Sequence, residues 1–124
     1  MTIEEIKKNR AFILTCKDAY FKKIRPADIE SRLSKEYKNL VEIAQLYFEN
    51  NLLEDFATYM MEGQYFIELW TAHLILKYGI SNESLRQQCI NVIIKYTDNP
   101  LARDVENEEK LWLKNYFEHQ TKNN

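Results

Sequence analysis

The chain has 124 residues, a formal net charge of −2, and only two glycines and two prolines. This length is typical of one domain, and the mildly acidic balance disfavours a nucleic-acid partner. Because turns depend on glycine and proline, their scarcity excludes a strand-rich fold and predicts long helices joined by short connections.

Charge is distributed unevenly along the chain. Residues 1–40 hold ten basic and six acidic residues, whereas residues 41–85 hold seven acidic residues and one basic residue, Lys77. The first ten residues lack the apolar segment of a signal peptide, and no run reaches the roughly 20 apolar residues of a membrane span. We therefore expect a cytoplasmic protein without a membrane partner.

The first 33 residues are expected to form a basic N-terminal helix and a loop. Thr2 and Glu5 have the spacing of a capping box, which starts a helix. Apolar spacing continues this helix to about Lys22. Pro26 then opens a polar loop with a short helical turn, because the residue before proline avoids the helical region.

The next stretch predicts a long helix followed by a short one. Ser34 is a suitable N-cap residue for the long helix, and Asn50 and Asn51 end it. The short helix covers residues 52–62. Gly63 follows as the expected C-terminal cap, in the left-handed conformation that glycine adopts easily.

Residues 64–79 are the most apolar stretch of the sequence and predict the central core helix. Their polar side chains Gln64, Glu68 and Thr71 fall within one narrow arc of a helical wheel. A helix with so thin a polar stripe is normally buried on most sides. Gly79 is expected to end it in the same left-handed way as Gly63.

Two further helices are predicted towards the C-terminus. Ser81 or Asn82 caps the first, over residues 82–97, and Asn99-Pro100 starts the second, which runs to about residue 120 with a bend near residues 105–107. The acidic group Glu106, Glu108 and Glu109 is interpreted as first-turn acids of a helix. Residues 121–124 are expected to fray.

Short connections force neighbouring helices to be antiparallel. Residues 52–63 pair with 64–79, and residues 82–97 pair with 100–120. The sequence therefore predicts one all-α domain over residues 1–124, with about six helices. Its antiparallel helical hairpins over residues 34–120 would stack as a short α-solenoid.

Four segments carry a family resemblance: EYKNLVEIAQLYFENNLLEDFATYM, WTAHLILKYG, LRQQCINVIIKY and EEKLWLKNY. Together they resemble the small HEAT-like helical domains of bacteria, some of which are immunity proteins of polymorphic-toxin systems. The resemblance covers roughly residues 35–117 and departs from the family pattern at Trp70 and His73. It implies a HEAT-like fold and a role in binding a toxin.

The sequence contains no catalytic, metal-binding or cofactor-binding motif, so we expect neither an enzyme nor a cofactor. His73 is interpreted as a hydrogen-bonded interior histidine and His119 as a solvated one. An enzyme would need a polar pocket around His73. Cys16 and Cys89 lack metal-ligand spacing, which favours two reduced, buried thiols over a disulfide.

The leading functional hypothesis is a non-catalytic module that binds a basic protein, such as a toxin domain, through an acidic face. Its expected contact residues are Glu54, Asp55, Glu62 and Glu68, with Tyr59 as an aromatic anchor. The alternative is a structural or regulatory protein that acts as a homodimer through Phe66, Trp70 and other apolar residues of the central helix. Oligomeric state, monomer or homodimer, is left open.

Overall fold

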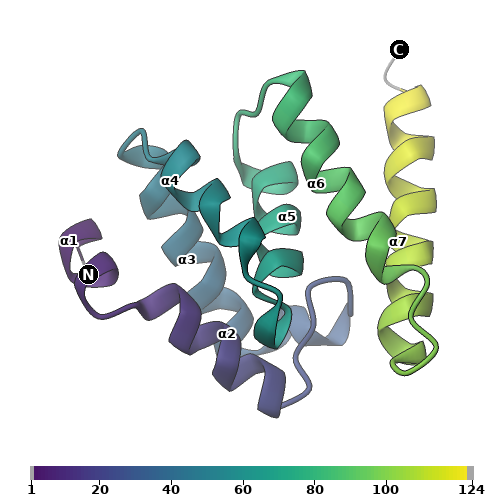
Figure 1. Cartoon of the computed structure of the whole chain (residues 1–124), viewed down its shortest axis with the longest axis horizontal. Helices are drawn as coiled ribbons and strands as arrows, with labels where there is room; N and C mark the ends of the chain where they lie inside the picture. The colour runs from purple at the N-terminus through teal and green to yellow at the C-terminus, as the bar shows by residue number, and fades with distance from the viewer. Residues whose placement is uncertain (1, 123–124) are drawn as a thin grey trace.

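The computed structural model describes residues 2–122, and within them it is all-α with no strand. Figure 1 shows the helices following one another from the N-terminus at one side to α7 at the other. The predicted fold class is therefore confirmed. No helix among residues 2–122 is both long and apolar enough to cross a bilayer.

The N-terminal segment forms two helices instead of the single one predicted. Helix α1 covers Ile3–Lys8 and α2 covers Ala11–Phe21, with Thr2 accepting the backbone N–H of Glu5 as predicted. Arg10 between them adopts the left-handed conformation, with φ 53°. This break allows Ile6 of α1 and Phe12 of α2 to be buried together in the core.

The middle of the chain follows the predicted order. A short 3-10 helix η1, Glu30–Leu33, precedes α3, Lys35–Glu49, and Ser34 caps α3 by accepting the N–H of Tyr37. Asn51, with φ 60°, ends α3. The predicted short helix is divided into α4, Leu53–Ala57, and the 3-10 helix η2, Thr58–Met61.

The central helix α5, Ile67–Tyr78, begins three residues later than predicted because residues 64–66 form the 3-10 helix η3, Gln64–Phe66. Every residue from Ile67 to Ile75 is buried, so its role as the core helix is confirmed. It contacts α2, α3, α4 and α6. Thr71 satisfies its buried hydroxyl by donating to the Ile67 carbonyl at 2.7 Å.

The prediction of left-handed glycines is wrong. Gly63 has φ −84° and Gly79 has φ −89°, both accessible to any residue. The left-handed positions before α5 belong instead to Tyr65 and Phe66, whose rings pack against Tyr20. Gly79 has a different reason to be glycine, because an added Cβ would lie 3.0 Å from the carbonyl oxygen of Ile75.

The last two helices are α6, Glu83–Tyr96, and α7, Arg103–Lys122. Asn82 is the N-cap of α6 and accepts the N–H of Leu85. The prediction that Pro100 opens the last helix is wrong, since Asn99 and Pro100 belong to a turn closed by the Ala102 N–H and the Asn99 carbonyl. Helix α7 is continuous, without the predicted bend, and reaches Lys122 of the predicted frayed tail.

The helices pack as the two predicted hairpins. Helix α5 contacts α4 and η2, and α6 contacts α7. The largest contact between elements joins the hairpins through α5 and α6, which lie next to each other in Figure 1. Cys16 and Cys89 are both buried and free, as the sequence predicts.

Candidate functional site

The predicted acidic residues are only partly brought together. Glu54 and Asp55 are exposed on α4, and Glu62 is exposed just after η2. Asp55 forms an ion pair with Lys7 of α1 at 3.3 Å, so part of its charge is balanced within the chain. We call Glu54, Asp55 and Glu62 the acidic ridge.

Glu68 is not part of this surface, which corrects the sequence prediction. Its side chain is 9% exposed and its carboxylate accepts from the Tyr96 hydroxyl at 2.8 Å and pairs with Lys95 Nζ at 2.7 Å. Burial, and then the hydrogen bond to Glu68, raise the pKa of Tyr96. Glu68 therefore links α5 to α6 through Oε1, the carboxylate oxygen that contacts both Tyr96 and Lys95.

Tyr59 is half-buried, and its ring and hydroxyl are both engaged. The hydroxyl lies 2.9 Å from that of Tyr47, and the ring packs on Phe12 at a centroid distance of 4.8 Å. Burial, followed by the contact with Tyr59, raises the pKa of Tyr47. Tyr59 is thus an edge of the core beside the acidic ridge.

Two grooves lie beside α4; Glu54 borders both of them and Asp55 borders one. One groove is continued by Leu53 and Ile80, and the other by Met60 and Met61. Ile80 is 95% exposed and Met61 is 88% exposed. Apolar side chains surrounded by charges are the usual anatomy of a protein-binding surface.

A separate cavity of about 220 Å³ lies along the other side of α5, and we call it the α5 cavity. Helix α5 supplies its buried wall, and α3, α7 and the segment before α3 supply the rest. The polar and aromatic side chains of its lining are Arg32, Tyr37, Trp70, His73, Lys77, Tyr78, Trp112 and Tyr116.

His73 is an interior, hydrogen-bonded histidine. Its Nε2 lies 2.5 Å from Oε1 of Glu109 on α7, a residue only 1% exposed. The ring of Trp112 meets the imidazole edge-on, with centroids 4.5 Å apart, and Tyr116 stacks on Trp112 at 12°. These contacts hold the imidazole and the indole of Trp112 in fixed orientations.

Trp70 presents an unpaired donor. The residue is 1% exposed, and its Nε1 is the one buried side-chain nitrogen or oxygen within the described residues that has no hydrogen-bond partner. The ring of Tyr37 packs against it at a centroid distance of 5.6 Å. A buried indole N–H normally has an acceptor, and the N–H of Trp70, a residue that lines the α5 cavity, has none among the protein groups.

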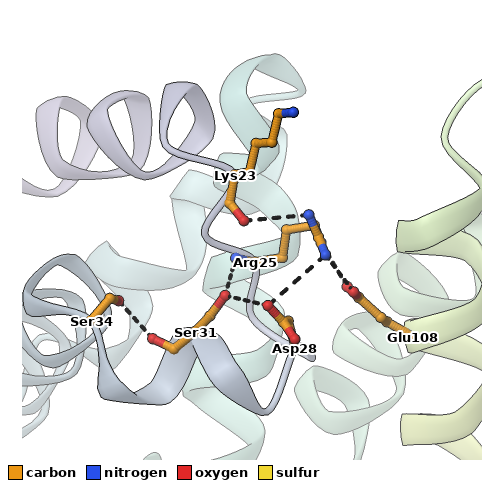
Figure 2. A network of polar contacts seen from close by, with 6 residues as sticks. All are labelled: Lys23, Arg25, Asp28, Ser31, Ser34 and Glu108. Carbon is orange, nitrogen blue, oxygen red and sulfur yellow. Dashed lines mark hydrogen bonds and ion pairs between the residues drawn. The ribbon is translucent and has the colours of Figure 1, made fainter.

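An ion pair outside the cavity lining joins the segment before α3 to α7. Arg25 donates from Nε and Nη2 to both carboxylate oxygens of Glu108 on α7, at 2.8 and 2.6 Å. Figure 2 shows the network around it, in which Ser31 accepts the Arg25 N–H and donates to Asp28. Because Arg32 follows directly, this network holds it at the cavity edge.

The α5 cavity offers groups suited to molecular recognition. Its lining contains aromatic rings, cations and hydroxyls, with no serine, threonine, cysteine or carboxylate. No cluster of metal-ligating side chains occurs among residues 2–122. The enzyme hypothesis requires a polar pocket around His73, whereas the lining of this cavity is mainly apolar.

Sequence reasoning missed Glu109, which it interpreted as a first-turn acid. Helical spacing contains the signal, since Val105, Glu109, Trp112 and Leu113 lie on one face of α7. An acid within an apolar stripe predicts a buried partner, and His73 is the matching group. Arg25 and Glu108 carry no comparable local signal.

Comparison of the chain with protein-family models, with curated proteins and with solved structures gave no match.

Proposed function

We propose that this protein is a non-catalytic module that binds a basic protein partner through the acidic ridge and its two grooves. The observation that carries the proposal is the position of Glu54 between grooves whose apolar residues Met61 and Ile80 are almost fully exposed. Apolar anchors would supply the buried area, and the carboxylates would steer a basic surface into place.

The contact set differs from the sequence hypothesis. It keeps Glu54, Asp55 and Glu62, adds Met61 and Ile80, and leaves out the buried Glu68. Tyr59 supports the ridge from behind through its contacts with Tyr47 and Phe12. In the more specific form of the proposal, the packed hairpins are a short HEAT-like solenoid and the partner is a bacterial toxin domain. The free thiols Cys16 and Cys89 support a reducing compartment such as the cytoplasm.

The test is cross-linked capture from host cells by wild type and by the double variant Glu54→Lys, Glu62→Lys. The matched control is Glu118→Lys, another exposed glutamate, on α7. We expect wild type and control to capture one protein with a basic surface, less efficiently at high salt. Equal capture by the double variant would reject the acidic ridge as the binding surface.

The alternative proposal, a homodimer, is supported by a different feature. Tyr20, Phe21, Tyr65 and Phe66 form an aromatic cluster with centroid distances of 5.2 to 5.9 Å, and Phe21 is 66% exposed. Tyr65 and Phe66 are both left-handed, a costly backbone state for bulky residues. Trp70, expected in such an interface, is buried and is excluded from it.

Light scattering at micromolar concentration tests the homodimer. A dimer through the aromatic cluster predicts twice the chain mass, and Phe21→Asp should return the protein to the mass of one chain. A wild-type protein that is monomeric under these conditions removes this candidate.

A further inference from the structure

We propose that the α5 cavity binds a small aromatic carboxylate, independently of the protein partner proposed above. The polar groups that line it are arranged to donate hydrogen bonds and to attract negative charge. Arg32 and Lys77 bring two cations, and neither has a carboxylate partner within the described part of the chain. No carboxylate lines the cavity, so an anion meets no repulsion from the lining.

The unpaired Trp70 Nε1 points to the same class of ligand. It is a donor that belongs to a lining residue, is 1% exposed and has no protein acceptor. A buried polar group without a partner is costly, and a carboxylate oxygen is a strong acceptor for an N–H. Because Nε1 itself has almost no accessible surface, an anionic oxygen would satisfy this donor after a small movement of the indole towards the cavity.

The walls favour a flat, apolar ring as the rest of the ligand. Trp112 and Tyr116 are stacked with centroids 5.1 Å apart, and Tyr37 closes on Trp70 from α3. Aromatic rings recognise another ring by stacking or by edge-to-face contact. An aliphatic anion of similar size would meet the same cations without these ring contacts.

The volume limits the ligand to about one ring system. At about 220 Å³ the α5 cavity is smaller than the roughly 300–1,000 Å³ of sites for drug-sized ligands. A ligand that consists of one benzene or indole ring and one carboxylate has a size that fits this volume. For a ligand of this size we expect a Kd of about 1 mM or lower.

The His73–Glu109 pair positions the ring wall. Glu109 contacts Nε2 of His73, and the imidazole ring in turn lies nearly perpendicular to the ring of Trp112. Glu109 does not line the cavity, and its Oε1 contacts His73 instead. We therefore assign Glu109 as a positioning residue, outside the set that touches the ligand.

The chain contains two tryptophans, and both line the α5 cavity. Two indole N–H signals in a ¹H–¹⁵N spectrum are therefore a direct reporter of this site. The experiment titrates full-length protein with benzoate and with indole-3-carboxylate. Cyclohexanecarboxylate, which has the charge without the flat ring, and benzyl alcohol, which has the ring without the charge, are the comparison compounds.

We expect saturable shifts of the Trp70 indole signal with both aromatic carboxylates, and weaker binding of both comparison compounds. The variant Arg32→Met, Lys77→Met should bind benzoate about fourfold more weakly, since each exposed ion pair contributes about a twofold effect. It should leave benzyl alcohol unaffected. The control Lys114→Met, an exposed lysine of α7 outside the cavity, should bind like wild type.

Both cations are exposed, so this double variant is expected to fold normally. Trp70→Phe gives a second readout, because it removes the donor and keeps an aromatic ring. Three outcomes overturn the proposal: no saturable shift with benzoate up to about 10 mM, ten times the expected Kd; equal affinity for cyclohexanecarboxylate; or equal weakening by Lys114→Met.

Discussion

Arg25 and Glu108 lie 83 positions apart in the chain and form a two-point ion pair that joins the N-terminal loop to α7. Both side chains are about one-fifth exposed, so water screens the pair only in part. The bond to Glu108 raises the pKa of Arg25, which keeps the guanidinium charged at any working pH. Two parallel bonds of this kind are stronger than a single surface contact.

The first prediction is that this pair is energetically coupled. A double-mutant cycle with Arg25→Gln and Glu108→Gln should give a coupling of about 1–3 kcal/mol in urea unfolding. The exposed pair Lys7–Asp55, at 3.3 Å, provides the comparison cycle and should give a smaller coupling. Equal couplings would mean that the Arg25 network of Figure 2 is only a surface feature.

The second prediction concerns the buried pair His73–Glu109. Removing one member of a buried pair leaves the other without its partner, which costs about 3–5 kcal/mol when a charge is stranded. His73→Leu strands the Glu109 carboxylate and should destabilise more than Glu109→Leu, which strands an imidazole. The double variant should be less destabilised than the sum of the two in thermal unfolding; simple additivity would contradict the pairing.

The third prediction uses the left-handed residue between α1 and α2. Arg10 is exposed at φ 53°, so Arg10→Gly should stabilise the protein by about 1 kcal/mol by removing the strain of a side chain there. Lys17→Gly, at an exposed interior position of α2, should destabilise it by about 1 kcal/mol. Chemical unfolding measures both. If both substitutions changed the free energy of unfolding in the same direction, the helix would not be broken at Arg10.

The fourth prediction separates the two glycines. Gly63→Ala should be neutral or stabilising by up to about 1 kcal/mol, because φ is −84° and no atom lies within 4 Å of the new Cβ. Gly79→Ala should destabilise, because the Cβ would lie 3.0 Å from the Ile75 carbonyl and 3.3 Å from Leu53. Thermal unfolding compares them directly, and a harmless Gly79→Ala would contradict the close packing of α5 against α4.

The fifth prediction is a pH dependence at the start of α7. The backbone N–H of Asn99, and then Lys110, lower the pKa of Glu106. A lowered pKa in the folded state stabilises the protein at neutral pH, and this contribution is lost as the pH falls below about 4 towards the folded pKa. Glu106→Gln should therefore have a lower Tm than wild type at pH 7 and a nearly equal Tm near pH 3. If the difference in Tm between the two proteins were the same at pH 7 and pH 3, ionisation of Glu106 would not contribute to stability.

Local chemistry explains the parts of the fold that the sequence predicted. Thr2, Ser34 and Asn82 cap helices because each accepts a backbone N–H three residues later, a contact within one turn. The apolar spacing of α5 likewise identifies the core without knowledge of its neighbours. These signals need only a few adjacent residues.

The failures have tertiary causes. Arg10, Tyr65 and Phe66 adopt left-handed conformations that no local preference favours, and ring packing on Tyr20 compensates at Tyr65 and Phe66. For the candidate site, the sequence identified His73 as interior but not its partner 36 positions away. It also placed Glu68 on a binding surface, because a helical wheel cannot show that Tyr96 and Lys95 of α6 cover it.

Trp70 and His73 illustrate what a departure from a pattern can indicate. Both stand out in the sequence, and both are buried residues that line the α5 cavity. Large side chains with polar ring nitrogens, placed within the most apolar helix of the chain, are therefore informative about a site even when their partners are unknown.

Glu108 and Glu109 are consecutive, and neighbouring residues of an α-helix project about 100° apart. One reaches Arg25 in the loop and the other reaches His73 in α5. Two attachments in different directions fix both the rotation of α7 about its axis and its position along that axis. A shift of α7 by one residue would bring the cation of Lys110 towards His73. The order of charges on three adjacent side chains therefore specifies one position of α7 against the rest of the chain.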